Sequence, residues 1–176
     1  AMIAVQEYEF DYGVKKGRLS VSHMNVSSGI NKVLEKYGVE ISKDILMSKN
    51  HIGLTTQIRH GNATLIMPVN FPMQIVILRE DMNADNPITN RLENLFYMWG
   101  SPLKVEKETI KENKLKLTEL FGTGKRAWTE KPEAFALLES FEPPLKLDSF
   151  ECGVLLEGQF PDAYKGKVRP KWTPKR

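Results

Sequence analysis

Alternating apolar and polar positions open the chain and predict β-strands. Tyr8, Phe10 and Tyr12 share one parity, residues 13–17 are rich in glycine and lysine, and the alternation resumes over residues 18–24. Two alternating runs joined by a short glycine-containing turn predict a β-hairpin. Three aromatic residues on one parity beside lysines could stack bases, but burial in a core is the commoner outcome for aromatic side chains, and we prefer it.

Helical spacing follows in residues 30–37, where apolar residues recur at i, i+3, i+4 and i+7. Ser27 or Ser28 can cap the start of this helix, and Gly38 can end it. Residues 45–50 follow neither period clearly and stay ambiguous.

Residues 52–79 form the clearest β region. One run leads to a turn at residues 60–62, and a turn at residues 70–72 precedes an apolar run over residues 73–78. Apolar residues at both parities place this last run inside a sheet. Pro68 has no N–H to donate, so its own strand is expected at an edge or with a bulge there.

A helix is expected over residues 86–99, because an Asn-Pro pair opens the segment and apolar residues follow helical spacing. This interpretation places Phe96 and Trp99 in the core and leaves Tyr97 for a partner surface. Residues 103–121 fit two structures. Their Lys/Glu-rich composition favours a helix in the second half, whereas the leucines there equally fit a strand paired back onto the first residues.

The predicted fold class is α+β, because strands come in runs with short turns rather than in strict alternation with helices. We expect a mainly antiparallel sheet of about five to seven strands with about two to four helices, including a short helix over residues 132–141 and a final strand within residues 145–157. The expected organisation is one globular domain, residues 2–158, followed by a basic, Pro/Lys-rich C-terminal arm, residues 159–176.

Charge is concentrated in one place. The chain carries 25 Lys/Arg and 22 Asp/Glu, and residues 165–176 alone hold six of the basic residues and no acid. Such a segment can neutralise phosphates, and its tryptophan can stack on a base or fill an apolar groove. The candidate nucleic-acid- or partner-binding residues are Lys165, Lys167, Arg169, Lys171, Trp172, Lys175 and Arg176, joined by Lys125 and Arg126 from a glycine-flanked loop.

Motifs for catalysis and cofactor binding are incomplete. The Gly-Thr-Gly-Lys run at residues 122–125 lacks the phosphate-loop pattern, which needs a glycine where Glu119 stands and Ser or Thr where Arg126 stands. The three histidines lack metal-ligand spacing, and Cys152 lies in an apolar alternating run typical of a buried thiol. We therefore expect no catalytic residue, no metal and no cofactor.

Three functions follow, in order of preference. The first is a non-enzymatic nucleic-acid-binding or nucleic-acid-associated accessory protein that uses the basic arm. The second is an assembly subunit whose arm docks on a protein partner or on a second copy of the chain, and the third is an enzyme whose site is not visible in the sequence. No apolar run approaches the roughly 20 residues that span a bilayer, so no membrane partner is expected. The single cysteine fits the cytoplasm or another reducing compartment.

Overall fold

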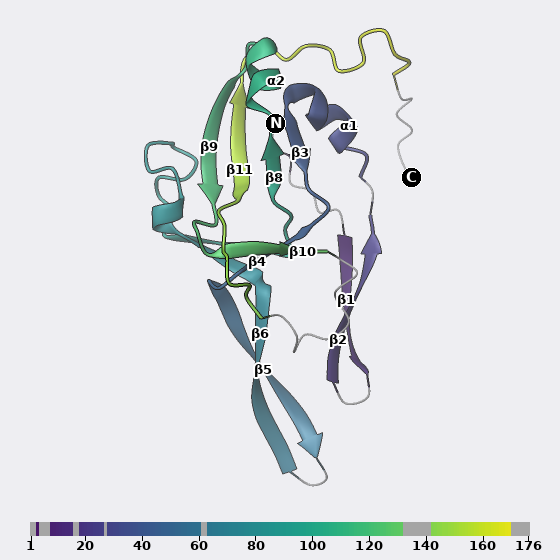
Figure 1. Ribbon diagram of the computed structural model, residues 1–176, viewed down its shortest axis with the longest axis vertical. Coiled ribbons are helices and arrows are strands. Elements are labelled where there is room, and N and C mark those ends of the chain that lie inside the picture. The colour runs from purple at the N-terminus through teal and green to yellow at the C-terminus, as the bar shows by residue number, and fades with distance from the viewer. Residues whose placement is uncertain are drawn as a thin grey trace.

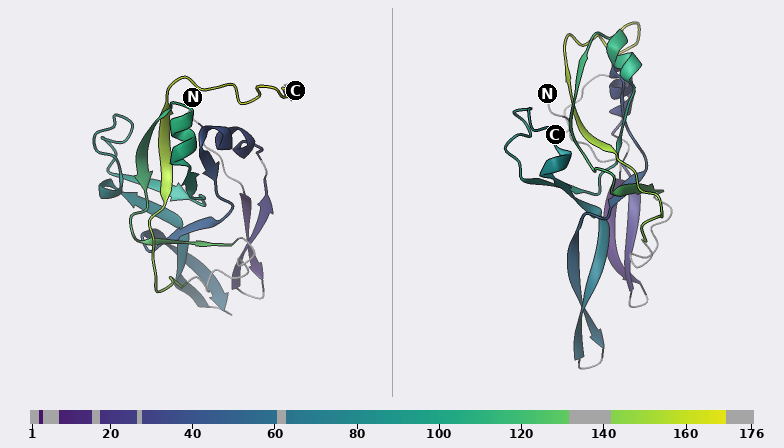
Figure 2. Two further views of the ribbon diagram at one scale, coloured as in Figure 1. Left: turned by 45° about the horizontal axis from the view of Figure 1, so that its top comes forward. Right: turned by 60° about the vertical axis from the view of Figure 1, so that its left-hand side comes forward.

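The computed structural model describes residues 3, 8–15, 18–26, 28–60, 63–131 and 142–169. The described chain is elongated, and two β-hairpins project from one end of its body in the same direction (Figures 1 and 2). The strands are β1 (Tyr8–Lys15), β2 (Arg18–Asn25), β3 (Val39–Ile41), β4 (Ile45–Ser48), β5 (His51–His60), β6 (Ala63–Leu78), β7 (Asn94–Met98), β8 (Leu103–Val105), β9 (Lys116–Gly122), β10 (Ala127–Glu130) and β11 (Glu151–Glu157). The helical segments are α1 (Asn31–Leu34), η1 (Glu35–Tyr37), η2 (Arg79–Asp81) and α2 (Lys107–Glu112).

The strands form four small antiparallel sheets. Two of them are two-stranded, β1-β2 and β10-β4, and the others have the orders β5-β6-β7 and β3-β8-β11-β9. Strands account for 45% of the chain, so the predicted α+β fold with one sheet of five to seven strands and two to four helices is wrong. The prediction failed because segments with helix-like spacing or composition pair as strands instead.

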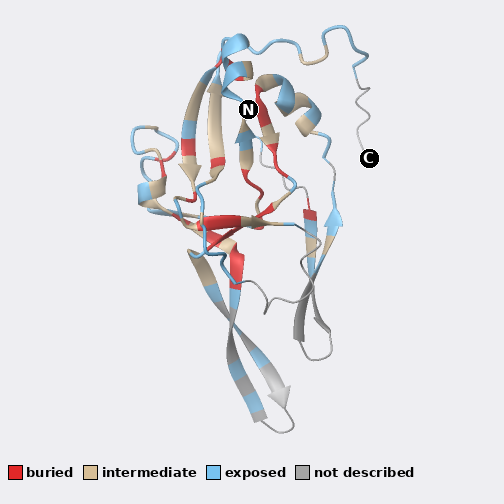
Figure 3. Cartoon of the chain, in the orientation of Figure 1, coloured by how far each residue is buried: buried red, intermediate tan, exposed pale blue. Residues whose placement is uncertain are grey.

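The core lies where β4 and β10 cross the body between the other sheets (Figure 3). Ile45, Leu46, Met47 and Ser48 all have 0% of their surface exposed. This strand is apolar at three consecutive positions because both of its faces are buried, which explains why residues 45–50 showed no clear period.

The strand β6 is longer than expected. Its register with β5 jumps from His51↔Ile75 to Gly53↔Asn70, so the predicted turn at residues 70–72 is wrong and a bulge stands there instead. The apolar run after the bulge lies between β5 and β7, as predicted. Pro68 pairs with Thr55 on one side, and the pairing of β6 with β7 starts only at Gln74, so the predicted edge position of this proline is confirmed.

The predicted helix over residues 86–99 is wrong. Asn86 does cap a single turn, since its Oδ1 accepts the N–H of Ile88 at 3.0 Å. The chain then extends into β7, which pairs antiparallel with the last residues of β6. Aromatic residues such as Phe96 and Tyr97 suit strands, and pairing with the edge of β6 decides between the two structures.

Residues 103–121 contain β8, α2 and the start of β9. The helix preferred for the second half is therefore wrong. The strand found there pairs with β11 rather than with β8, because β11 inserts between them. The predicted hairpin over residues 8–24, the helical turns over residues 30–37 and the final strand are confirmed, whereas the helix expected at residues 132–141 lies outside the described residues.

The end of the first helical segment provides a stability test. Gly38 has φ +81°, and a Cβ there would lie 2.7 Å from the Glu106 carbonyl oxygen and 2.7 Å from Ile110 Cγ1. We expect Gly38→Ala to lower the free energy of unfolding by about 2–5 kcal/mol, through backbone strain and crowding together.

Gly29→Ala is the matched control, because Gly29 has φ +69° but nothing within 4 Å of an added Cβ. It should cost only the backbone term, about 1–2 kcal/mol. Urea denaturation of both variants measures the difference. Equal losses would show that the contact between Gly38 and α2 is not tight.

Candidate functional site

Along the strand β7, side chains alternate between a half-buried face and an exposed face. Leu95 and Tyr97 are half-buried against the body, whereas Phe96 and Met98 each keep 57% of their surface exposed. The Tyr97 hydroxyl donates to the Ser101 carbonyl oxygen at 2.7 Å, and burial raises the pKa of Tyr97 well above its usual range. The predicted places of Phe96 and Tyr97 were therefore exchanged, because helical spacing assigned the wrong face.

The outward residues of β7 share a sheet face with β6. Val76 lies directly opposite Phe96, and Gln74 lies opposite Met98. Side chains opposite each other on adjacent strands are about 4.5–5.5 Å apart at Cβ. Phe96, Met98 and Val76 therefore form one apolar patch on the outer face of this sheet, which we call the β6–β7 face.

The free edge of β7 also presents its backbone. The Trp99 N–H donates to the Met73 carbonyl oxygen at 2.9 Å, so the peptide group before it directs the Met98 carbonyl away from β6. Backbone groups alternate along a strand, so the N–H and C=O of Phe96 and Met98 point to the outer edge. No described strand pairs with that edge. An apolar face and unpaired backbone groups thus coincide at β7.

Arg126, a predicted binding residue, is part of an internal ion pair. Its guanidinium pairs with Glu80 at 2.9 Å and also with Asp81. Partial desolvation would lower the pKa of Arg126, but the hydrogen bonds that its guanidinium donates to these two carboxylates outweigh it and raise the pKa. The loop thus holds η2 against β10. The neighbouring Lys125 is exposed and remains a candidate contact.

The first part of the predicted basic arm packs on the body. The ring of Phe160 lies edge-on against that of Tyr37 at 5.1 Å between centroids, and the Tyr37 hydroxyl donates to the Pro161 carbonyl at 3.0 Å. Arg169 pairs with Asp162 at 2.7 Å, so its charge is matched within the chain. Lys165 and Lys167 are exposed, and Lys171, Trp172, Lys175 and Arg176 lie outside the described residues. Binding by these residues stays a prediction.

In the part of the chain that the structure describes, groups suited to chemistry are dispersed or buried. Cys152 is buried as predicted, and burial, with a smaller contribution from Glu151, raises the pKa of its thiol far above the usual range. Such a thiol is a poor nucleophile at neutral pH. Among the described residues, no three His, Cys, Asp or Glu side chains converge on a metal site. No helix of the described chain is long and apolar enough to cross a membrane.

The chain belongs to a family described as "ABC-type uncharacterized transport system", whose model matches residues 1–176. Comparison with curated proteins and with solved structures finds no match. The prediction of a nucleic-acid-binding protein is therefore wrong, because this is an auxiliary family of a transport system. That prediction relied on local positive charge. Part of this charge is neutralised within the chain, because Glu80 and Asp81 pair with Arg126 and Asp162 pairs with Arg169. The family points instead to protein partners in a transport system.

Removal of the Arg126 guanidinium should cost stability. Asp81 has only 12% of its side chain exposed and would lose its cation. We expect Arg126→Gln to lower the free energy of unfolding by about 1–3 kcal/mol. Lys125→Gln, at an exposed position, should change it by less than about 0.5 kcal/mol. Urea denaturation compares the two variants. An unchanged free energy of unfolding in Arg126→Gln would show that the ion pair contributes nothing to stability.

Acid should open the turn that begins at Asp162. This carboxylate accepts the Tyr164 N–H and pairs with Arg169, and both interactions lower its pKa below the ordinary value of 3.8. A lowered folded-state pKa means that the turn is fully stabilised above pH 3.8 and weakens as the pH falls through the lower value. The amide resonance of Tyr164 in an NMR titration should report that midpoint.

Asp162→Asn is the control for this titration, because it keeps an oxygen for the Tyr164 N–H but cannot ionise. The variant should show no acid midpoint at Tyr164. A wild-type midpoint at or above 3.8 would contradict the assignment of the pair.

Proposed function

We propose that this chain is an auxiliary subunit of an ABC-type transport system and that it binds a protein subunit of that system through the β6–β7 face and the free edge of β7. Two observations support the proposal together. The family match covers the whole chain. Phe96 and Met98, each 57% exposed, lie on a strand whose outer backbone groups have no described partner.

An exposed edge strand with apolar side chains is a template for pairing with another chain. Soluble proteins usually protect such edges from pairing with lysine, with proline or with a covering segment, and β7 itself contains neither lysine nor proline. An extended segment of the partner could add to β7, with main-chain hydrogen bonds giving affinity and alternate side chains packing on Phe96 and Val76. Binding of this kind needs no catalytic group.

The apolar part of the contact can be tested with the purified ATP-binding and membrane-spanning subunits of the transport system. We expect Phe96→Asp combined with Met98→Asp to weaken the complex about 10- to 100-fold, because each exposed side chain would lose an apolar contact of about 1 kcal/mol or more and a charge would be buried. Isothermal titration calorimetry measures the affinity.

Ile66→Asp is the control for adding a carboxylate at an exposed apolar residue outside the β6–β7 face. Ile66 is 68% exposed on β6, far along the projecting hairpin and away from β7. It should bind as the wild type does. Equal loss in both variants, or no loss in either, would contradict the β6–β7 face as the contact.

The backbone part of the contact has its own test. The Phe96 N–H points to the free edge, so Phe96→Pro should leave the β6–β7 pairing intact but remove a donor for an added strand. Leu95→Pro removes a hydrogen bond to β6 and should destabilise the fold itself. Complex formation by folded Phe96→Pro at wild-type affinity would rule out strand addition.

A further inference from the structure

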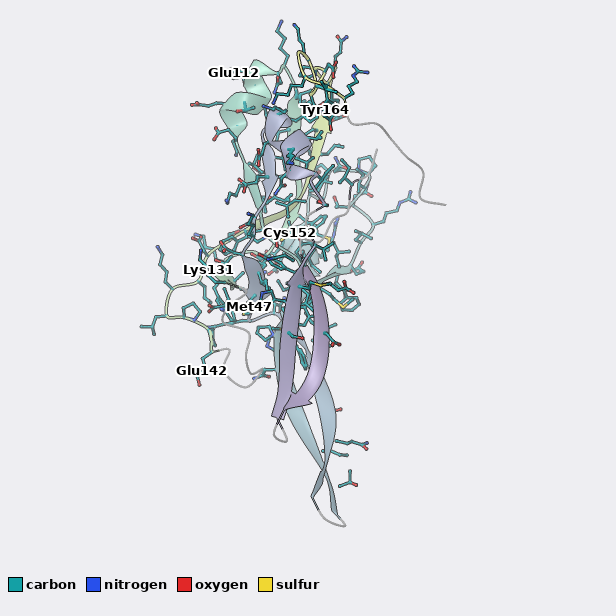
Figure 4. The ribbon with its side chains drawn as sticks, turned by 90° about the vertical axis from the view of Figure 1, so that its right-hand side faces the viewer. Met47, Glu112, Lys131, Glu142, Cys152 and Tyr164 are labelled. Atoms are coloured by element: carbon teal, nitrogen blue, oxygen red, sulfur yellow. The ribbon has the colours of Figure 1, made fainter. Side chains whose placement is uncertain are left out.

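A second surface feature lies at the other end of the body, away from the projecting hairpins. There α2 turns into β9 (Figure 1), and Glu112 of α2 lies at the same end as Tyr164 (Figure 4). A shallow recess of about 470 Å³ opens between the helix and the strand. It is lined by Lys107, Ile110, Lys111, Lys114, Leu115, Lys116 and Leu117.

The recess combines an apolar floor with a cationic rim. Ile110 and Leu115 are 3% and 8% exposed, so the floor is fixed by the core, and Leu117 is half-buried. The rest of the lining is lysine, and no acidic residue of the described chain is part of it. The charged residues that line the recess are therefore all cationic, although the chain as a whole is nearly balanced.

The four lysines are not equivalent. Lys107 pairs with Glu119 at 3.1 Å, and Lys116 pairs with Glu157 at 3.3 Å. Within the described part of the chain, Lys111 and Lys114 pair with no carboxylate. Two ammonium groups are thus left for a ligand from outside.

The backbone holds these two lysines in place. The Lys114 N–H donates to the Lys111 carbonyl at 2.9 Å, and the Leu115 N–H donates to the Ile110 carbonyl at 3.0 Å. Lys114 adopts φ +55°, a conformation that a residue other than glycine holds only at a cost. The lysines also complement the carboxyl end of α2, but that role needs no apolar recess between them.

We propose that this recess binds an acidic segment of a protein partner, with one apolar side chain seated on Ile110, Leu115 and Leu117 and carboxylates placed against Lys111 and Lys114. Charge complementarity selects an anionic ligand. The apolar floor is concave and its residues do not protrude, whereas a membrane-binding surface inserts protruding apolar side chains into the bilayer. A protruding side chain from another protein fits this shape. The inference does not depend on binding at β7.

The probe is a short fluorescent peptide in which one leucine is flanked by glutamates, titrated with the full chain in a fluorescence anisotropy assay. We expect saturable binding that weakens as salt is raised, because the contact is largely ionic. Lys111→Glu combined with Lys114→Glu should weaken it at least about 10-fold, since two attractions become repulsions.

Lys49→Glu combined with Lys146→Glu is the matched control, since both lysines are exposed, lie outside the recess and give the same change in charge. This variant should bind within about twofold of the wild type, a free-energy change below about 0.5 kcal/mol. A peptide with serine in place of leucine should bind several-fold more weakly if the floor is used.

Three outcomes would overturn the proposal. Equal weakening by the two double variants would show a general charge effect. Equal binding of the leucine and serine peptides would show that the recess is not occupied. Co-sedimentation with phosphatidylglycerol vesicles that requires Lys111 and Lys114, without binding of the peptide, would assign the surface to a lipid instead.

Discussion

Complete burial of β4 is the constraint on which the rest of the structure depends. Ile45 and Met47 enter one core cluster, with Trp99, Trp128 and others, whereas Leu46 enters a second cluster with Ile75 and Ile77. A single strand thus supplies the centre of two cores on its opposite faces. Each fully buried Ile, Leu or Met contributes about 1.5–3 kcal/mol. The partner strand β10 follows the same alternation, since Ala127 lies in the second cluster and Trp128 in the first. The backbone of β4 is also hydrogen-bonded on the edge away from β10, where the Leu46 N–H donates to the Gly100 carbonyl at 3.0 Å.

This arrangement explains why the surface is available for partners. A strand buried on both faces separates the sheets around it, so each sheet stays small and keeps edges of its own. The last part of β6 is anchored by Ile75 and Ile77 in the second cluster. It can therefore carry β7 as an edge strand without further cover. The bulge after Asn70 lets the first part of β6 leave the body with β5 as a projecting hairpin. The same burial that stabilises the fold thus produces an exposed edge.

The sequence predicts those elements whose signals are local. The hairpin over residues 8–24 and the turn that ends at Gly38 follow from alternation and from a glycine with positive φ, and both are found. The signals failed where a neighbouring strand decides the structure. Leu95, Phe96 and Trp99 fit helical spacing, but pairing with the edge of β6 makes β7 a strand that places Leu95 inward and Phe96 outward, and Trp99 is buried directly after it. The β6–β7 face was missed for this reason, because exposure of an aromatic residue depends on which period the chain adopts. Residues 45–48 carried no period because both of their faces are buried.

Charge shows the same difference between sequence and space. The basic residues over 165–176 and in the loop at residues 125–126 were the most visible signal in the sequence. In the structure, however, Arg169 pairs with Asp162 and Arg126 pairs with Asp81. Lys111 and Lys114 gave no signal, because glutamates on either side make that stretch look balanced. In the fold, the charged residues that line the recess between α2 and β9 are lysines, and the described glutamates of that stretch lie outside its lining. An ammonium group is available to a partner when no carboxylate of its own chain lies within reach, and that is a property of the fold rather than of local composition. For a chain whose family points to protein partners, unpaired charge next to fixed apolar surface is therefore a better guide to an interface than the density of charge along the sequence.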